Sequence, residues 1–328
     1  MSAPRLSAIV VAPEGVAAVA TTVRHLSAQT VAAEIELVLI TLQTDEGAER
    51  GLDAGALAST RTTTVDAVRS NAAGYAAGIR AASGDIVVLC EDHSYPDPGW
   101  AAALLAAYAP DVAAVGPVVA CANPSGAVAW ADFLLGYGPW LDPTPSADVE
   151  YLPGHNSSYR RALLLQYEPD LEAWLEAESV LHWDLRRRGH RLRLESKART
   201  HHFNFSKPSS WLTATYLQSR TFGGRRIAGA GRLRQLAWLL AVPLIPLVRL
   251  RRTLRDVHRL DGGPSLARLL PALVLALLVS AAGEAVGYAR GTGTAPQRVY
   301  HYEFLRTRHV NARDLEAMAK ARFWEHSP

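Results

Sequence analysis

The stretch IVVLCEDHSYPDPGW, residues Ile86 to Trp100, changes from apolar to charged to turn-forming within fifteen positions. The apolar part, Ile86–Cys90, has the length and composition of a buried strand. Glu91, Asp92 and His93 follow it directly, and charges at the end of a buried strand are costly unless a partner holds them. Because open α/β sheets bind their ligands at the carboxyl ends of strands, the stretch predicts a charged ligand site there.

Short apolar segments alternate with helical patterns through the first two thirds of the chain. This alternation is typical of βαβ units, so we expect an α/β fold with an open, mostly parallel sheet flanked by helices. The expected strands are Leu6–Val11, Ile35–Ile40, Ile86–Cys90 and Val112–Val119, and the expected helices are Gly15–Ala28, Val65–Ala82 and Gly99–Tyr108.

The composition is that of a globular protein, with 49% hydrophobic and 20% charged residues among 328. A net charge of +3 is too small to indicate a nucleic-acid partner. The two cysteines, Cys90 and Cys121, do not indicate a disulfide framework or a cysteine-based zinc site. The apolar run near the N-terminus is only as long as a strand, which does not fit a signal peptide, so we expect a cytoplasmic catalytic part.

Two dense apolar runs, Ala237–Val248 and Leu269–Ala282, follow in the last third of the chain. Each is shorter than the roughly 20 residues that a helix needs to cross a bilayer. Arginines precede and follow the first run, which argues against a simple crossing. We expect helices that lie in or dip into the cytoplasmic leaflet, with a buried helical hairpin of a soluble protein as the alternative.

The segment GIRAASGDIVVLCEDHSYPDPGW, Gly78–Trp100, resembles family-2 glycosyltransferases with the GT-A fold. In that family a helix ending in G-I-x-x-A-x-G-[DE] leads to a strand capped by Asp-x-Asp, and a Pro-x-x-Trp-like stretch starts the next helix. The triplet Glu91-Asp92-His93 falls at the Asp-x-Asp position. The resemblance extends more loosely from about Leu6 to Phe222 and implies transfer of a sugar from an activated donor.

The resemblance implies that Glu91, Asp92 and His93 hold a divalent cation. Such a cation neutralises the diphosphate that leaves as the glycosidic bond breaks. Glu91 and His93 replace the family's two aspartates, and this mixed donor set suits Mn²⁺ better than Mg²⁺. The family often adds a histidine at the position of THHF, where we name His201. The neighbouring histidine points to the opposite face of a strand, so only one of the two reaches the site.

Glu178, within LEAWLEAESVLHWDLRRRGHRLRLE (Leu171–Glu195), aligns with the family's catalytic base when counted back from Gly189. An inverting transferase needs this carboxylate to remove the proton of the acceptor hydroxyl. Glu176, on the same expected helix, is the rival for this role, and the alternative for Glu178 is a solvated helix face that makes i,i+4 pairs, for example with His182. In LPGHNSSYRR, residues 152–161, the resemblance places His155 and Asn156 in the sugar or acceptor pocket, although these residue types also cap helices.

The donor side of the expected site departs from the family pattern. Arg220, or alternatively Arg225, belongs to YLQSRTFGGRR, which resembles a mobile arginine-bearing loop that closes over donor phosphates. Pro13 and Glu14 follow the first strand where the family binds the nucleotide. Asp45 alone stands downstream of the second strand, which lacks the paired aspartates of the family. The donor is therefore open between UDP, GDP and polyprenyl-phosphate sugars.

The sequence predicts three segments: a GT-A glycosyltransferase domain (1–230), an apolar membrane-associated segment (231–290) and a polar tail (291–328) with a helix at Ala312–Phe323. The expected partners are a nucleotide-sugar donor, a cell-envelope lipid or saccharide acceptor and the cytoplasmic face of the cell membrane, with no nucleic acid. The alternative is a catalytically degenerate binding protein at the membrane. A nucleotidyltransferase is disfavoured because Val11–Gly15 carries no basic residue.

Overall fold

The computed structural model describes residues 4–42, 51–260 and 264–325. These residues form two compact units, each assembled from separate parts of the chain. The first unit contains the chain up to Ala120, Asp142–His202 and the end of the chain from Ala317. The second unit contains Cys121–Leu141 and Phe203–Glu316, so the expected segment boundary at residue 230 falls inside it.

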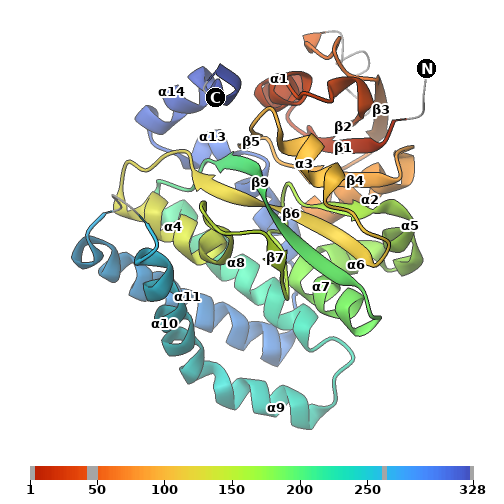
Figure 1. Cartoon of the computed structure of the whole chain (residues 1–328). Helices are drawn as coiled ribbons and strands as arrows, with labels where there is room; N and C mark the ends of the chain where they lie inside the picture. The colour runs from red at the N-terminus through yellow and green to blue at the C-terminus, as the bar shows by residue number, and fades with distance from the viewer. Residues whose placement is uncertain (1–3, 43–50, 261–263, 326–328) are drawn as a thin grey trace. The chain divides into compact units, whose positions relative to one another are not determined.

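The first unit is built on one nine-stranded sheet in the order β3-β2-β1-β4-β8-β6-β9-β5, with β7 paired to β9 (Figure 1). Strands β3, β2, β1 and β4 are parallel, β8 is antiparallel to β4 and β6, and β5 and β7 are antiparallel to β9. The expected α/β fold with an open sheet flanked by helices is confirmed, and the sheet is mixed rather than mostly parallel. The strands are β1 (Leu6–Val11), β2 (Ile35–Leu42), β3 (Ser59–Val65), β4 (Ile86–Cys90), β5 (Ser94–Pro96), β6 (Val112–Cys121), β7 (Ala147–Asp148), β8 (Ser158–Arg160) and β9 (Arg191–His202).

The four apolar strands were predictable because each is buried along its whole length or nearly so, which requires a continuous apolar run. Strand β3 has the sequence STRTTTV with mostly exposed side chains, since it lies at the edge of the sheet, and the apolar pattern misses it. We expected a helix over Val65–Ala82, but β3 extends to Val65, and the observed helix α2 covers only Asn71–Ala81. It begins where Ser70 Oγ accepts a hydrogen bond from Ala73 N at 3.0 Å.

Helices and short 3₁₀ turns connect the strands of the first unit and cover its sheet (Figure 1). Helix α2 approaches β1 closely through Gly78, because a Cβ at this position would lie 2.2 Å from Ile9 Cγ2. Only glycine, which has no Cβ, therefore fits at the point where α2 crosses β1. The elements are η1 (Val16–Val19), α1 (Ala20–Ser27), η2 (Ala32–Glu34), α2, α3 (Trp100–Ala106), α5 (Arg161–Leu164), η6 (Leu165–Tyr167), α6 (Leu171–Leu175), α7 (Glu178–Arg187) and η8 (Phe323–Glu325).

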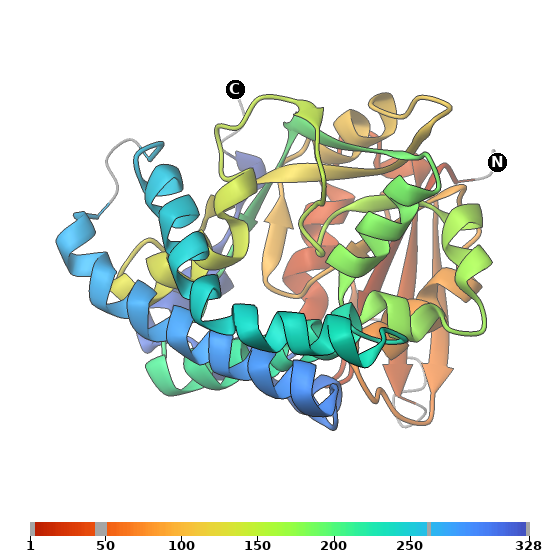
Figure 2. The ribbon, with the colours of Figure 1, turned by 90° about the horizontal axis from the view of Figure 1, so that it is seen from below.

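The second unit is helical, and the two apolar runs of the sequence form three of its helices, α9, α10 and α11 (Figure 2). Helices α9 and α10 are joined through the 3₁₀ turn η7, and α14 passes from this unit into the first. The elements are α4 (Ala127–Tyr137), η5 (Gly138–Trp140), α8 (Pro208–Arg226), α9 (Arg232–Ala241), η7 (Val242–Leu244), α10 (Ile245–Val257), α11 (Leu266–Arg290), α12 (Ala295–Glu303), α13 (Arg306–His309) and α14 (Ala312–Lys320).

Glycines allow α8 and α11 to touch backbone to backbone. A Cβ at Gly287 would lie 2.4 Å from Arg220 O, and one at Gly283 would lie 2.5 Å from Tyr216 O. On the other helix, a Cβ at Gly223 would lie 2.8 Å from the carbonyl oxygen of residue 284. Because the last part of the family-like segment packs this tightly on the second apolar run, the two belong to one compact unit.

A buried carboxylate joins α10 to α11. Glu284 is fully buried and pairs with Arg249 of α10, with 2.5 Å between Nη2 and Oε1. Tyr288 donates a hydrogen bond to the other carboxylate oxygen at 2.6 Å, and Arg249 also donates to Ser280 Oγ at 2.6 Å. Removing one partner of a buried ion pair leaves an uncompensated charge, so this network fixes the place of α10 on α11.

The substitution Gly287→Ala tests the close approach of α8 and α11. Alanine in place of glycine inside a helix ordinarily adds about 1 kcal/mol of stability. Here the new methyl group meets backbone, so we expect a loss of about 1–3 kcal/mol from overpacking. Gly136→Ala in α4 is the matched control, since a Cβ there meets nothing within 4 Å. Thermal unfolding measures both, and a Gly287→Ala protein as stable as the control would contradict this packing.

Candidate active site

A buried carboxylate with imidazoles around it occupies the end of β4. Glu91 lies directly after the strand, and its Oε2 is 3.4 Å from His93 Nε2 and 3.5 Å from His202 Nε2. On its other side, Oε1 is 3.0 Å from His155 Nδ1. Burial would raise the pKa of Glu91, but the imidazoles of His155, His93 and His202 hold this pKa well below its usual range. The carboxylate is therefore ionised and faces three histidines.

The ligand atoms of Glu91, His93 and His202 all lie within 4.8 Å of one another, and all three residues are buried. Two ligand atoms in adjacent positions, each about 2.1 Å from an octahedral ion, are about 3 Å apart. Glu91 Oε2 lies at comparable distances, 3.4 and 3.5 Å, from Nε2 of His93 and Nε2 of His202. One carboxylate oxygen and two imidazole nitrogens are ligands that proteins offer to divalent cations. The residues present therefore fit a divalent cation.

Asp92, which we predicted as a metal ligand, lies behind His93. Its Oδ1 accepts a hydrogen bond from His93 Nδ1 at 2.6 Å, and this leaves Nε2 directed toward Glu91. A carboxylate that orients a ligating histidine in this way fixes its tautomer and raises its basicity. The structure thus places Asp92 beside His93 and outside the group of Glu91, His93 and His202.

The adjacent histidines of β9 point in opposite directions, as a strand requires. It is His202 that faces Glu91, whereas His201, the residue we named, places its Nε2 2.8 Å from Asp97 Oδ1. The register explains the choice, because His202 lies opposite Ser94 and His201 opposite Tyr95. The cluster therefore contains His202 in place of His201.

The last described residues of the chain pack on the far side of this strand. The ring of Phe323, in η8, stacks on His201 with 3.8 Å between centroids and 3° between planes. Tyr95 stacks on His25 beside it, with centroids 4.8 Å apart. The sequence predicts no function for the polar tail (291–328). No sequence signal links Phe323 to a histidine in β9, because only the fold brings these two residues together.

The loop before β8 carries the third histidine. Asn156 adopts φ 55°, a left-handed conformation that is uncommon outside glycine, and its backbone N–H donates to Leu89 O at 2.7 Å. This bond ties the loop to β4 two residues before Glu91, so His155 reaches the carboxylate. Of the two residues predicted for the acceptor pocket, His155 thus contacts the cluster, and Asn156 shapes the loop.

Glu178 is the first residue of α7, where the positive end of the helix dipole favours a carboxylate. Its carboxyl group packs against Gly154, because a Cβ added there would lie 2.8 Å from Glu178 Cδ and 2.9 Å from Oε1. The predicted base therefore adjoins the loop that carries His155. We expected one continuous helix here, but α6 ends at Leu175, and Glu176 caps it.

His182 connects α7 to the same loop. It is fully buried, its Nδ1 accepts a hydrogen bond from Leu152 N at 3.3 Å, and its Nε2 is 2.9 Å from Tyr159 Oη. Burial lowers the pKa of His182 from 6.5 to about 3, so the ring is neutral. The sequence pattern gave His182 only as a possible partner of Glu178, and its bonds to residues 152 and 159 were not foreseen.

The predicted donor-binding residues belong to different elements of the chain. Pro13 is buried and Glu14 is exposed in the turn after β1, and Asp45 lies outside the described residues. The stretch Tyr216–Arg226, expected as a loop, is the second half of helix α8, which starts at Pro208 and continues through Gly223 and Gly224. Arg220 lies in this helix, in the second unit, and donates a hydrogen bond to Gly291 O at 3.3 Å.

A sequence profile described as "Glycosyltransferase like family 2" matches residues 4–222, which is more than half of the chain. The chain therefore belongs to this family and is a glycosyltransferase. The match agrees with the observed α/β fold and with the resemblance noted in the sequence. No curated protein matches the chain by sequence.

Two solved glycosyltransferases are similar to the chain at low identity. The first is the mannosyltransferase PcManGT from Pyrobaculum calidifontis in complex with GDP-Man and Mn²⁺, at 16% identity and a TM-score of 0.47, with 100% of this chain and 89% of that one covered. The second is GalNAc-T7 with UDP, GalNAc and Mn²⁺, at 12% identity and a TM-score of 0.44, with 62% and 44% covered. Both similarities are too distant to assign a substrate.

Three single substitutions, at His202, Asp92 and His201, test the metal cluster. We expect His202→Ala to weaken Mn²⁺ binding by at least about a hundredfold, since it removes a ligand, and Asp92→Asn to weaken it by about 10–100-fold, as for other residues that support a ligand. His201→Ala is the matched control and should leave Mn²⁺ affinity nearly unchanged. Calorimetry with Mn²⁺ measures all three, and a larger loss in His201→Ala than in His202→Ala would contradict the assignment.

The neutral state of His182 predicts how stability depends on pH. Its pKa is lower in the folded protein than in the unfolded chain, so its contribution is complete above about pH 6.5 and is lost as the pH falls toward 3. The slope is up to about 1.4 kcal/mol per pH unit for one histidine.

Urea unfolding at pH 7, 6 and 5 measures this slope. We expect His182→Gln to unfold with a shallower pH dependence than the wild type. Tyr159→Phe removes one hydrogen-bond partner but leaves the buried ring, so it should lower stability and keep the slope. An unchanged slope in His182→Gln would show that another group governs the acid sensitivity.

Proposed function

We propose that this glycosyltransferase transfers a sugar from a nucleotide-diphosphate donor to a cell-envelope lipid or polysaccharide with inversion at the anomeric carbon. The observation that supports this most is the convergence of Glu91, His93 and His202 at the end of β4, next to the loop that adjoins Glu178. A donor diphosphate and an acceptor base need such neighbouring positions, since one holds the leaving group and the other activates the attacking oxygen.

The chain's own residues divide the work between two sides of the site. Mn²⁺ or Mg²⁺, when bound by the cluster, supplies positive charge against the leaving diphosphate. Asp92 accepts a hydrogen bond from Nδ1 of His93, so that Nε2 is the ring nitrogen that faces Glu91 and would bind the cation. On the other side, Glu178 takes the proton of the acceptor hydroxyl as that oxygen attacks. His155, 21% exposed, is the imidazole of the site that reaches solvent and is placed to meet the acceptor.

We further propose that the transferase works at the cytoplasmic face of the cell membrane, with residues 1–230 as the catalytic segment, 231–290 as the membrane-associated segment and 291–328 as a tail. Two helical stretches, Arg232–Val257 and Leu266–Arg290, are long and apolar enough to cross a membrane. This supports membrane association, although buried core helices also meet that criterion. An acceptor that is itself anchored in the membrane is consistent with such a location.

A degenerate, non-catalytic protein is the second candidate, because Glu91 and His93 replace the family's two metal-binding aspartates. Hydrolysis or transfer from a panel of UDP- and GDP-sugars with Mn²⁺ distinguishes the two. Turnover of one donor that requires Mn²⁺ supports catalysis. Donor binding without any turnover, in the presence of membrane extract as a source of acceptors, supports the degenerate alternative.

The substitution Glu178→Gln tests the base. It keeps the shape of the side chain and removes its basicity, so we expect turnover to fall by about 10²–10⁴-fold, or roughly 3–5 kcal/mol of transition-state stabilisation. Donor affinity should change little, because the diphosphate is held elsewhere. Glu176→Gln, at the end of α6, is the matched control and should retain most activity. A larger loss in Glu176→Gln would mean that the base is misplaced.

A further inference from the structure

Large apolar side chains are exposed in one region of the second unit. Among the residues that the structure describes, every exposed large apolar side chain except Leu315 lies on α9, η7, α10 or α11. None of the most apolar window of Arg232–Val257 is buried, compared with 44% of that of α11. The exposed residues are Leu233, Leu236, Leu240, Leu244, Leu247, Val248, Leu270, Val274, Leu275 and Leu278.

On α9, η7 and α10 these residues form a single stripe. Steps of three or four residues separate Leu233, Leu236, Leu240, Leu244 and Leu247, which puts them on one helical face. Leu233 is 85% exposed and Leu240 is 72% exposed, so the stripe is open along its length. We call these five residues the leucine stripe.

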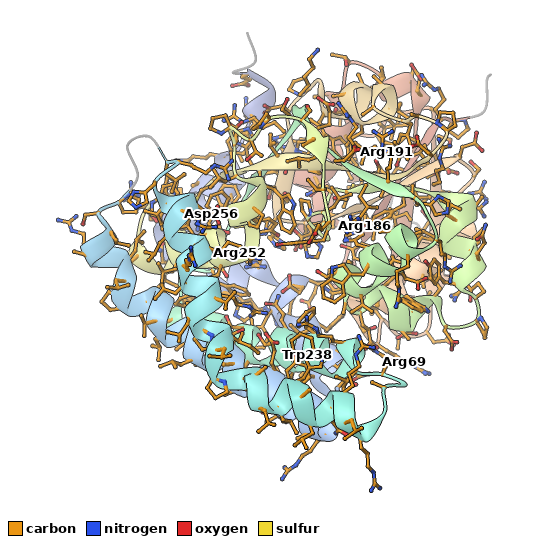
Figure 3. The ribbon with its side chains drawn as sticks, turned by 60° about the horizontal axis from the view of Figure 1, so that its bottom comes forward. Arg69, Arg186, Arg191, Trp238, Arg252 and Asp256 are labelled. Carbon is orange, nitrogen blue, oxygen red and sulfur yellow. The ribbon has the colours of Figure 1, made fainter. Side chains whose placement is uncertain are left out.

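The opposite face of the same helices is packed against the protein. Trp238 stacks on Tyr288 of α11 with 5.9 Å between centroids, and Gln235 donates a hydrogen bond to Tyr288 O at 2.6 Å. Further along, Arg249 pairs with the buried Glu284, and Asp256 is buried as well. Figure 3 labels Trp238 on α9 and Asp256 on α10. One face is thus held by specific polar and ring contacts, and the exposed large apolar side chains lie on the other.

The stretch Arg232–Val257 has the length of a membrane span only in total, because it consists of two shorter helices with a 3₁₀ turn between them. Helix α9 has 10 residues and α10 has 13, which correspond to about 15 and 20 Å, whereas the hydrocarbon core is about 30 Å thick. The chain changes direction between them at η7, where Pro243 and Pro246 interrupt the hydrogen-bond ladder (Figures 1 and 2). Helix α11 is long enough, but it is half buried on α8 and contains Glu284.

Exposed arginines lie at both ends of the stripe. Arg232 and Arg234 precede or interleave with its first residues, and Arg251 and Arg255 continue the same face four and eight residues after Leu247. Exposed cations next to exposed leucines match the layers of a bilayer surface, in which anionic phosphates lie above acyl chains. If a second copy of the chain docked on this face with the same face, it would have to place acidic groups against these arginines. The exposed charges beside the leucine stripe are arginines, so the two faces would not be complementary.

We propose that the leucine stripe docks in the plane of a bilayer that contains anionic lipids, with the leucines in the outer acyl region of one leaflet and the arginines at the phosphates. This inference rests on the proposed membrane association and specifies its geometry. The α9–η7–α10 segment lies in one leaflet and does not cross it.

Cosedimentation of the full chain with vesicles tests the apolar contact. On vesicles with 30% phosphatidylglycerol, we expect Leu240→Glu and Leu244→Glu each to weaken binding by at least about tenfold, because one buried leucine is lost to the bilayer. Leu315→Glu is the matched control, since this leucine is exposed but lies outside the stripe, and it should bind like the wild type. Equal binding by all variants would overturn the proposal.

The arginines are tested by charge. The double variant Arg251→Gln, Arg255→Gln should lose about 30-fold in affinity for the same vesicles, on the basis of about 1 kcal/mol for each cation near an anionic surface. Its affinity for pure phosphatidylcholine vesicles should equal that of the wild type. A double variant that binds anionic vesicles as tightly as the wild type would remove the role of these arginines.

Labelling of single cysteines separates in-plane docking from crossing. In sealed proteoliposomes, Ala228→Cys before α9 and Arg259→Cys after α10 should react with an impermeant maleimide from the same side. Labelling of the two from opposite sides would overturn the proposal, as would a lipid-free dimer that Leu240→Glu dissociates. None of these readouts depends on turnover, so a failure here is distinguishable from a failure of the proposed transferase activity.

Discussion

The ionised carboxylate of Glu91 is the group on which the site depends. A buried charge at the end of a central strand is tolerated only because imidazoles from three different segments surround it. Each of these segments is then fixed by a further contact: His93 by Asp92, His202 by the pairing of β9 with β5, and the His155 loop by its bond to β4. The same charge that costs solvation energy therefore organises the surrounding loops around a potential cation position.

On the proposed acceptor side of the site, a neutral buried histidine and a glycine fix the position of Glu178. His182 is kept neutral by burial and bonds the backbone of the loop that contains Gly154, and Gly154 leaves room for the Glu178 carboxyl group. The proposed general base and the proposed metal cluster are thus coupled through one loop of a few residues. Small changes in this loop are expected to alter both sides together, because His155, which contacts Glu91, directly follows Gly154, which packs against Glu178.

The helical unit combines two kinds of contact that serve different ends. Glycines bring α8 and α11 into backbone contact, and the Arg249–Glu284 pair fixes α10, so one face of the apolar segment is rigidly packed. The remaining face exposes leucines that an aqueous environment disfavours. A surface helix pair that is fixed on one side and apolar on the other is suited to contact with a lipid leaflet.

The sequence by itself determined the buried strands, the family and the charged end of β4, because these depend on local composition and on short motifs. It did not determine β3, whose exposed edge needs no apolar pattern, or the break between α6 and α7 that separates Glu176 from Glu178. Only the tertiary structure decided that His202 rather than His201 faces Glu91, since the register of β9 against β5 sets the direction of each side chain. It also brought Phe323 onto His201, a contact between residues more than 100 positions apart that no local pattern encodes.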